Sequence, residues 1–132
     1  MPAGEEGTIM KYMCFCYYDP QKVANLSPAE MEAIPGECGP HDEALNNSGK
    51  KVVLGCFTEP ETWRSIRPVD GKPSVTEGTF LSTQEQVGVF FVVEAESIDE
   101  AVEIASLHPG AHLGKFFGGG IEVRPCELYE EY

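Results

Sequence analysis

Glu77 lies in the segment Thr76-Glu77-Gly78, next to a glycine, and it is the carboxylate whose setting best suits chemistry. Backbone amides in such a loop orient a carboxylate, and a buried carboxylate that faces a ligand acts as a general base. Binding and catalytic residues are often found on loops of this kind. The alternative is that Thr76-Glu77-Gly78 forms a tight turn and nothing more. We therefore take Glu77 as the candidate catalytic residue and Thr76 as a candidate ligand contact.

Arginines are scarce in this chain, which has nine basic and 22 acidic residues. Arg67 and Arg124 fall on expected strands, where a guanidinium can hold a ligand carboxylate through two parallel hydrogen bonds. Both are candidate ligand-binding residues, with Arg67 facing a sheet-lined cavity. The alternative for each is an ion pair across the sheet, for example between Arg124 and a neighbouring glutamate.

Aromatic residues on the expected strands suit a cavity for a flat organic ligand. Tyr18 and Phe80 are the candidate ligand contacts among them. The alternative is that these rings belong to the core and to a dimer interface, as aromatic residues in strands usually do. The set is Tyr17, Tyr18, Trp63, Phe80, Phe90 and Phe91.

Histidine and cysteine spacing does not match a metal site. Pro109 and Gly110 separate His108 from His112, so the two rings do not share one helix face as zinc-binding pairs do. Either ring could carry a proton near neutral pH, but a surface loop is the favoured interpretation. Cys14 and Cys16 share a strand face without the turn-type spacing of zinc sites, so core packing is favoured. We predict no metal and no cofactor.

The elements that must position these residues are strands and helices with clear sequence signals. Ser27 and Glu30 form a capping box, and the expected helix ends near Ile34 because Pro35-Gly36 follows. Further helices are expected from Pro40 to Gly49 and after Ser97. The expected strands are residues 10–18, 51–58, 62–69, 74–76, 87–95 and 121–124, with a hairpin turn at Asp70-Gly71.

This order of elements predicts an α+β fold of the ferredoxin-like type, with an antiparallel sheet and helices on one face. The strands are apolar on both sides, so the second face of the sheet also needs a cover. A second copy of the same sheet is the simplest cover, which predicts a homodimer with an associated cavity. Residues 10–132 are expected to form one domain, preceded by a flexible tail over residues 1–9.

Charge and composition narrow the function classes. The net charge of −13 disfavours binding to nucleic acid and to an anionic membrane surface. No apolar run is long enough to span a bilayer. The chain has five cysteines, an odd number without a CxxC pair, which fits reduced thiols in the cytoplasm.

Several segments, in order along the chain, resemble the DGPF branch of the YCII-related proteins. The segment Val75-Thr76-Glu77-Gly78-Thr79-Phe80 is similar to the V-T-D-G-P-F motif of that branch. The other similar segments are Met10 to Met13, Tyr18 to Pro20, Leu26 to Met31, Thr62 to Arg67, Asp70 to Lys72, Gln84 to Gly88 and Ile121 to Pro125.

The resemblance implies a ferredoxin-like domain that pairs through its sheets, as in the dimeric α/β barrel superfamily. Distant relatives carry out proton transfers on small ring compounds. This sequence departs from the motif at Glu77, Thr79 and Gln84, where the family has aspartate, proline and lysine. The histidine–aspartate pair proposed as catalytic in the wider YCII group has no counterpart that the sequence alone places.

The sequence therefore favours a small-molecule enzyme of proton-transfer type that acts in a dimer-associated cavity. The alternative is a non-catalytic protein that binds a metabolite or regulates a partner protein. The missing histidine–aspartate pair and the acidic surface favour this second class, and fold alone does not decide between the two.

Overall fold

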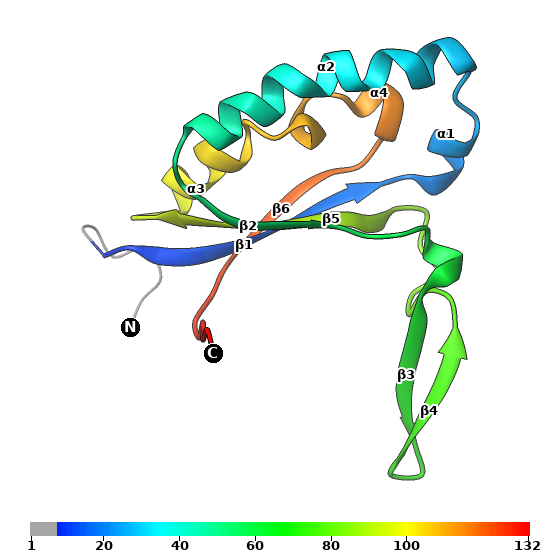
Figure 1. Ribbon diagram of the computed structural model, residues 1–132. Coiled ribbons are helices and arrows are strands. Elements are labelled where there is room, and N and C mark those ends of the chain that lie inside the picture. The colour runs from blue at the N-terminus through cyan, green and yellow to red at the C-terminus, as the bar shows by residue number, and fades with distance from the viewer. Residues whose placement is uncertain (1–7) are drawn as a thin grey trace.

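The chain folds around a four-stranded antiparallel sheet with the strand order β2-β5-β1-β6. In this computed structural model, which describes residues 8–132, the helices lie on one face of that sheet (Figure 1). Two β-α-β units build it, and the predicted α+β ferredoxin-like fold is confirmed. The elements are β1 (Met10–Tyr18), α2 (Pro28–Asn47), β2 (Lys51–Cys56), β5 (Gln86–Ala95), α3 (Ile98–Ala105) and β6 (Gly120–Pro125). Of the tail predicted over residues 1–9, residues 1–7 lie outside the described part of the chain.

The core lies between the sheet and α3. Alternate residues of β1 and β5 point toward the helices, as the period of a strand requires. The apolar stripe predicted for α3 meets them, since Ala101, Ile104 and Ala105 are buried. The strand residues of this core are Tyr12, Cys14, Phe91, Val93 and Ala95.

Helix α2 is one continuous helix of 20 residues, so the predicted break at Pro35-Gly36 is wrong. The capping box between Ser27 and Glu30 is present and starts the helix. Each internal proline removes one backbone hydrogen bond, but the turns on either side keep theirs. Leu45 is the buried residue of α2. The helix is therefore held against the core near its C-terminal end.

The β3–β4 hairpin extends away from the main sheet as a separate two-stranded ribbon (Figure 1). Its strands are β3 (Arg64–Val69) and β4 (Lys72–Glu77), so the return strand is longer than predicted. Asp70 and Gly71 have φ of 51° and 77°, which two-residue hairpin turns of this kind require. The predicted turn is therefore confirmed, and the strand before it begins two residues later than expected because η1 (Pro60–Thr62) occupies its start.

Two short helices occupy segments for which no helix was predicted. Helix α1 (Pro20–Ala24) follows β1 directly, and the Asp19 carboxylate caps it by accepting from the Gln21 amide at 3.0 Å. Helix α4 (Gly114–Phe117) lies between the predicted helix after Ser97 and the last predicted strand, just before Gly118, Gly119 and Gly120. Gly119 then returns the chain to β6 with a φ of 63°, and a Cβ there would lie 2.0 Å from the Tyr17 carbonyl oxygen. Only glycine fits this close approach.

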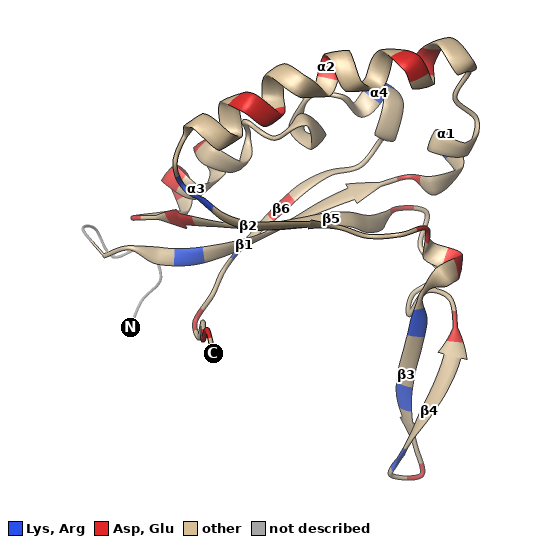
Figure 2. Ribbon diagram, viewed as in Figure 1, with Lys and Arg blue, Asp and Glu red and all other residues tan. Residues whose placement is uncertain are grey.

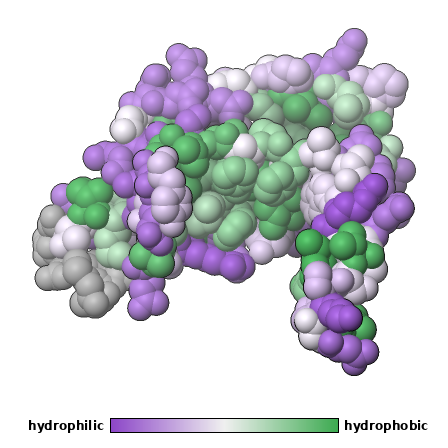
Figure 3. Space-filling view, turned by 60° about the horizontal axis from the view of Figure 1, so that its bottom comes forward, coloured by the Kyte–Doolittle hydropathy of each residue, from purple (hydrophilic) through white to green (hydrophobic). Residues whose placement is uncertain are grey.

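The face of the sheet away from the helices carries apolar side chains. Strand register places Met13 beside Val92 and Phe15 beside Phe90 on this face. Val53 also pairs with Val92 and is 44% exposed. Figure 3 shows hydrophobic residues gathered across the middle of this side of the molecule. No helix in residues 8–132 is both long and apolar enough to cross a membrane.

Candidate functional site

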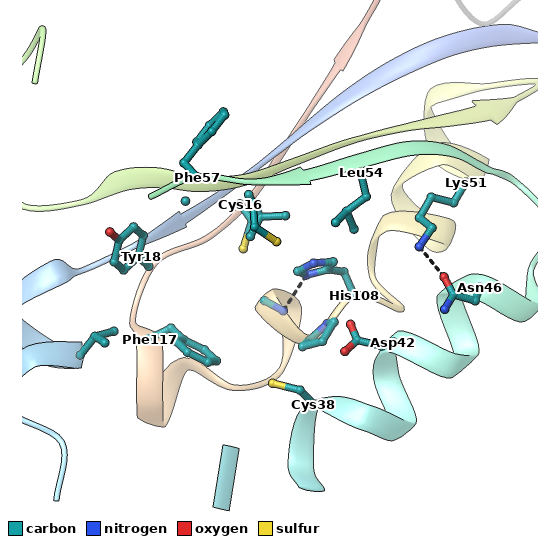
Figure 4. Close-up of a pocket in the computed structure, with 16 residues that line it drawn as sticks. Cys16, Tyr18, Cys38, Asp42, Asn46, Lys51, Leu54, Phe57, His108 and Phe117 are labelled. Atoms are coloured by element: carbon teal, nitrogen blue, oxygen red, sulfur yellow. Dashed lines mark hydrogen bonds between the residues drawn. The ribbon is translucent and has the colours of Figure 1, made fainter. Parts of the chain in front are cut away.

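A cavity of about 650 Å³ lies between the helix-covered face of the sheet, α2 and the turn η2 (Pro109–Ala111), as Figure 4 shows. A volume of this size suits a small organic molecule. Apolar side chains and three thiols form most of its wall. The lining residues are Cys16, Tyr18, Val23, Cys38, Asp42, Asn46, Lys51, Leu54, Cys56, Phe57, Gly88, Val89, His108, Pro109, Gly110 and Phe117.

The sheet forms the floor of the cavity through residues in register on three strands. Cys16 on β1 pairs with Val89 on β5, and Val89 pairs with Cys56 on β2. Residues directly opposite one another in a sheet point to the same face, so all three side chains face the cavity. Burial raises the pKa of the Cys16 thiol to about 11, with a smaller contribution from Cys56. Cys16 is therefore a neutral thiol near pH 7 and forms an apolar part of the cavity wall.

One side of α2 forms the opposite wall. Cys38, Asp42 and Asn46 are spaced four residues apart, which places them on one helix face. Their side chains point toward the sheet and the η2 turn (Figure 4). Lys51 on β2 reaches across and donates a hydrogen bond to the Asn46 side-chain oxygen. This wall of the cavity thus carries the Asp42 carboxylate and the Lys51 ammonium group, which is hydrogen-bonded to the Asn46 side chain.

His108 is the buried titratable residue of this site. It is 7% exposed and follows α3, where the chain turns into η2. Its ring stacks on Phe91 with a centroid distance of 4.9 Å and an angle of 10°. Its Nδ1 accepts a hydrogen bond from the Gly110 amide at 2.9 Å. Because Nδ1 is the acceptor, the neutral ring carries its proton on Nε2.

His108 lines the cavity, and among residues 8–132 its Nε2 forms no hydrogen bond. Burial lowers the pKa of His108, and Lys51 and His41 lower it further, against an opposing effect of Asp42. The ring is therefore neutral at pH 7, with its proton on Nε2.

Gly110 allows the η2 turn to come close to the sheet. A Cβ at this position would lie 2.3 Å from the Cys16 sulfur and 3.1 Å from His108 Nδ1. A larger residue would push the turn away and break the hydrogen bond that fixes the imidazole. Among residues 8–132, no group of three or more His, Cys, Asp or Glu side chains is arranged as a metal site.

Comparison with known proteins places the chain in a family. Residues 10–124 match the YCII-related domain. The chain belongs to the YCII-related family. An uncharacterised protein of Rhizobium meliloti (strain 1021) is 26% identical over 121 residues, which cover 92% of this chain and 95% of that protein.

Among solved structures, the 5-chloro-2-hydroxyhydroquinone dehydrochlorinase of Burkholderia phenoliruptrix AC1100, in complex with 2,5-dihydroxybenzoquinone, matches with a TM-score of 0.47 and 17% identity. The match covers 93% of this YCII-related chain and 96% of the dehydrochlorinase chain.

The residues predicted for a site lie in three separate places in this YCII-related protein. Tyr18 lines the cavity, as proposed for a ligand contact. Thr76 and Glu77 are exposed on β4 of the hairpin, and Glu77 lies opposite Arg64. These hairpin residues do not line the cavity beneath α2.

The two predicted arginines both have partners close by. Arg67 lies over the Phe80 ring at 3.8 Å and donates to the Phe80 carbonyl oxygen at 3.1 Å. Arg124 donates through Nε to Glu122 at 2.9 Å, and its guanidinium lies 4.8 Å from the Phe15 ring centroid. The Arg124 hydrogen bond lowers the pKa of Glu122. The ion-pair alternative thus describes Arg124, although its partner lies on the same strand.

The sequence interpretation missed most of the cavity. His108 was assigned to the surface, which is wrong because the ring is buried. Asp42 and Lys51 were not predicted as site residues at all. The four-residue spacing of Cys38, Asp42 and Asn46 was a usable signal, but the expected break in α2 separated Cys38 from the other two.

Proposed function

We propose that the cavity beneath α2 binds a small organic molecule and moves a proton on it. The observation that supports this proposal is that Asp42 and a neutral His108 line one largely apolar cavity of about 650 Å³. A carboxylate accepts a proton, and an imidazole N–H stabilises an oxygen that gains negative charge. A titratable group whose pKa is shifted by burial in a cavity, as that of His108 is, is typical of active sites.

The experiment compares two neutralised carboxylates on α2. The gently purified protein is analysed by native mass spectrometry, and any molecule it retains is tested for isomerisation or elimination with Asp42→Asn and Glu43→Gln. Glu43 is the matched control because it is exposed on the same helix and does not line the cavity. Loss of a general base lowers turnover by about 10²–10⁴-fold, so we expect that loss in Asp42→Asn alone. Equal turnover in both variants contradicts the proposal.

Glu77, the base predicted from the sequence, is kept as a separate hypothesis. It lies on the hairpin, so a ligand in the cavity meets Asp42 and not Glu77 of the same chain. Glu77→Gln in the same assay therefore separates the two candidates. Turnover that falls in Glu77→Gln and not in Asp42→Asn would move the chemistry to a site that includes the hairpin and Arg67.

A non-catalytic binding protein is the second candidate. The predominance of apolar side chains around the cavity supports it, together with the Cys16 thiol that burial keeps neutral, because such a wall binds a ligand without supplying further acid–base groups. A retained ligand that the protein binds but does not convert would favour this class.

We also propose that the protein is a homodimer formed through the open faces of two sheets. The hairpin supports this proposal, because an isolated two-stranded ribbon is marginally stable in water. Ile66 and Val75 form a cross-strand pair on it and are 60% and 63% exposed. The apolar open face of the sheet is a surface of matching character.

A cytoplasmic location is the last part of the proposal. All five cysteines lie within the described residues, and all five are free thiols. Reduced thiols in this number are usual in a reducing compartment.

A further inference from the structure

One face of the β3–β4 hairpin carries two cations and, among its strand residues, no carboxylate. Successive residues of a strand alternate between the faces of a ribbon, and residues directly opposite one another share a face. Arg67 and Val69 are two residues apart on β3, and Lys72 pairs with Val69, so these three side chains share one face (Figure 2). On the other face, Arg64 lies opposite Glu77, so a cation and a carboxylate balance there.

The two cations of this basic face lack the partners that other basic residues have. Among residues 8–132, three other basic side chains form ion pairs with glutamates, whereas Arg67 and Lys72 form none. The Arg67 guanidinium stacks on the Phe80 ring at 3.8 Å and donates through Nη2 to the Phe80 carbonyl oxygen. This contact fixes the guanidinium and leaves its other N–H groups without a partner in the described part of the chain. A carboxylate is the partner that such a fixed guanidinium fits.

The acidic segment, residues 126–132, has the complementary character. It contains three glutamates and no basic residue. Leu128 is 75% exposed, and Tyr132 is fully exposed, so apolar side chains accompany the carboxylates. The basic face of the hairpin has exposed apolar neighbours as well, since Val69 and Phe80 are both more than half exposed. The two surfaces thus match in charge and in apolar character.

Within one chain, the acidic segment and the hairpin lie at opposite ends of the main sheet. The Cys126 amide donates to the Lys11 carbonyl oxygen at 2.9 Å, which holds the segment beside the start of β1. The hairpin joins the sheet where β5 begins, and Gln86 there pairs with Tyr18 at the end of β1. The strand from Lys11 to Tyr18 is about 23 Å long. Both the segment and the hairpin project on the open side of the sheet, away from the helices (Figure 1).

We propose that the acidic segment of each copy of the chain binds the basic face of the hairpin of a second copy. This assignment rests on the proposed dimer. A two-fold axis that brings two open faces together and runs across the strands exchanges the ends of the sheets. Each hairpin then meets the acidic segment of the partner, and the dimer contains two equal contacts.

Glu130 is the carboxylate of the acidic segment that we assign to Arg67 of the other copy. Glu131 already accepts a hydrogen bond from the Tyr129 hydroxyl at 3.0 Å, whereas Glu130 forms none among residues 8–132. The exposed Leu128 is available to cover the apolar neighbours of the basic face.

The test reverses one charge on each side of the contact. Dimer dissociation constants of the whole chain are measured by sedimentation with fluorescence detection for Arg67→Glu, Glu130→Lys and the double variant. Each single reversal brings like charges together and should raise the constant about tenfold. The double variant restores an opposite pair, so its constant should return close to the wild-type value. Because Arg67 also stacks on Phe80, Lys72→Glu provides a second reversal on the same face that breaks no such stack.

General repulsion between two acidic copies predicts a different pattern. Glu130→Lys replaces a charge of −1 by one of +1, which changes the net charge from −13 to −11. This change alone would tighten the dimer, whereas loss of the contact weakens it. Lys22→Glu is the matched control for Arg67→Glu, because it makes the same change in net charge at an exposed position on α1. It should change the dissociation constant far less than Arg67→Glu does.

The outcomes separate this inference from the proposed dimer. A wild-type mass of one chain would remove the dimer and the contact together. A dimer whose dissociation constant is the same in wild type, Arg67→Glu and Glu130→Lys overturns the contact and leaves the dimer in place. Weakening in both single variants without recovery in the double variant overturns the pairing of the two residues. A small anion that native mass spectrometry finds on wild type and not on Arg67→Glu, with an unchanged dissociation constant, would assign the basic face to that anion instead.

Discussion

Tyr12 is fully buried, and its hydroxyl has no hydrogen-bond partner among residues 8–132. Burial raises the pKa of this phenol, and Glu100 raises it further. An unpaired buried hydroxyl costs free energy that a phenylalanine ring of nearly the same shape does not. We expect Tyr12→Phe to raise the free energy of unfolding by about 1 kcal/mol, measured by urea denaturation.

Tyr17→Phe is the matched control for Tyr12→Phe. Tyr17 lies on the same strand, but its hydroxyl donates to Glu122 at 3.2 Å. Removing this hydroxyl should leave the free energy of unfolding unchanged or slightly lower. A loss of stability in Tyr12→Phe would contradict this prediction, because it would mean that the Tyr12 hydroxyl forms a stabilising hydrogen bond.

The stability of the protein should depend on pH through His108. Burial lowers the pKa of His108 in the folded state, so between the folded and unfolded pKa values the unfolded chain binds more protons. The free energy of unfolding must therefore rise with pH in this range and fall as the pH drops below about 6.5. In His108→Asn this contribution is absent. Urea midpoints from pH 5 to 8 should show a flatter dependence in the variant, and equal slopes would contradict the lowered pKa.

Individual site residues could be predicted from the sequence only where local pattern decides their position. Tyr18, predicted as an aromatic ligand contact on a strand, does line the cavity, since it ends β1 next to it, and its contact with a ligand stays a prediction. The burial of His108 was not predicted, because it depends on the approach of Gly110 to Cys16, residues far apart in the sequence. Contacts of this kind arise from packing between elements, and no local spacing reports them.

At the scale of elements, helix α2, which forms one wall of the cavity, has weak intrinsic helix propensity. It contains Pro35, Gly36, Gly39 and Pro40, and Leu45 is its buried residue. A Cβ at Gly36 or Gly39 would meet nothing within 4 Å. Alanine at position 36 should therefore stabilise the helix by about 0.5–1 kcal/mol. Position 39 differs because Gly39 precedes Pro40, whose ring disfavours a Cβ on the residue before it. Hydrogen exchange of the α2 amides should therefore slow in Gly36→Ala.

Gly55→Ala is a control for this effect. A Cβ at Gly55 would lie 2.3 Å from the Phe90 ring, so this substitution should destabilise the protein. Unchanged exchange of α2 in Gly36→Ala would mean that packing, and not helix propensity, sets the stability of this helix.

Strands and helices differ in how well their sequences predicted them. The bounds of β1 were predicted in full and those of β5 within one residue, because their apolar runs lie in the centre of the sheet. The continuity of α2 was not predicted, since the local cost of proline was given more weight than the anchoring of its ends. Helix α4 was missed because it is only four residues long, begins with a glycine and has no side-chain cap.

At the scale of the whole molecule, the distribution of charge differs between the hairpin and the rest. Arg64, Arg67 and Lys72 lie on β3 and β4, against two acidic residues between Arg64 and Glu77, in a chain of net charge −13 (Figure 2). The hairpin thus has more basic than acidic residues, so it repels another acidic copy of the chain less than the chain average does. In the proposed dimer, its exposed apolar pair and the apolar open face of the sheet would provide the contact area.

The dimer proposal predicts that a valine-to-aspartate substitution weakens the dimer at one of two similarly exposed positions and not at the other. Val53 on the open face of the sheet is 44% exposed, and Val102 on the outer side of α3 is 46% exposed. A charge buried in an interface without a partner is costly, whereas a charge on an exposed helix face is not. Val53→Asp should therefore raise the dimer dissociation constant at least tenfold, while Val102→Asp leaves it unchanged. Light scattering after size-exclusion chromatography measures both, against a chain mass of 14.4 kDa. A wild-type mass of one chain, or equal effects of both aspartates, would show that the open face is not the dimer interface.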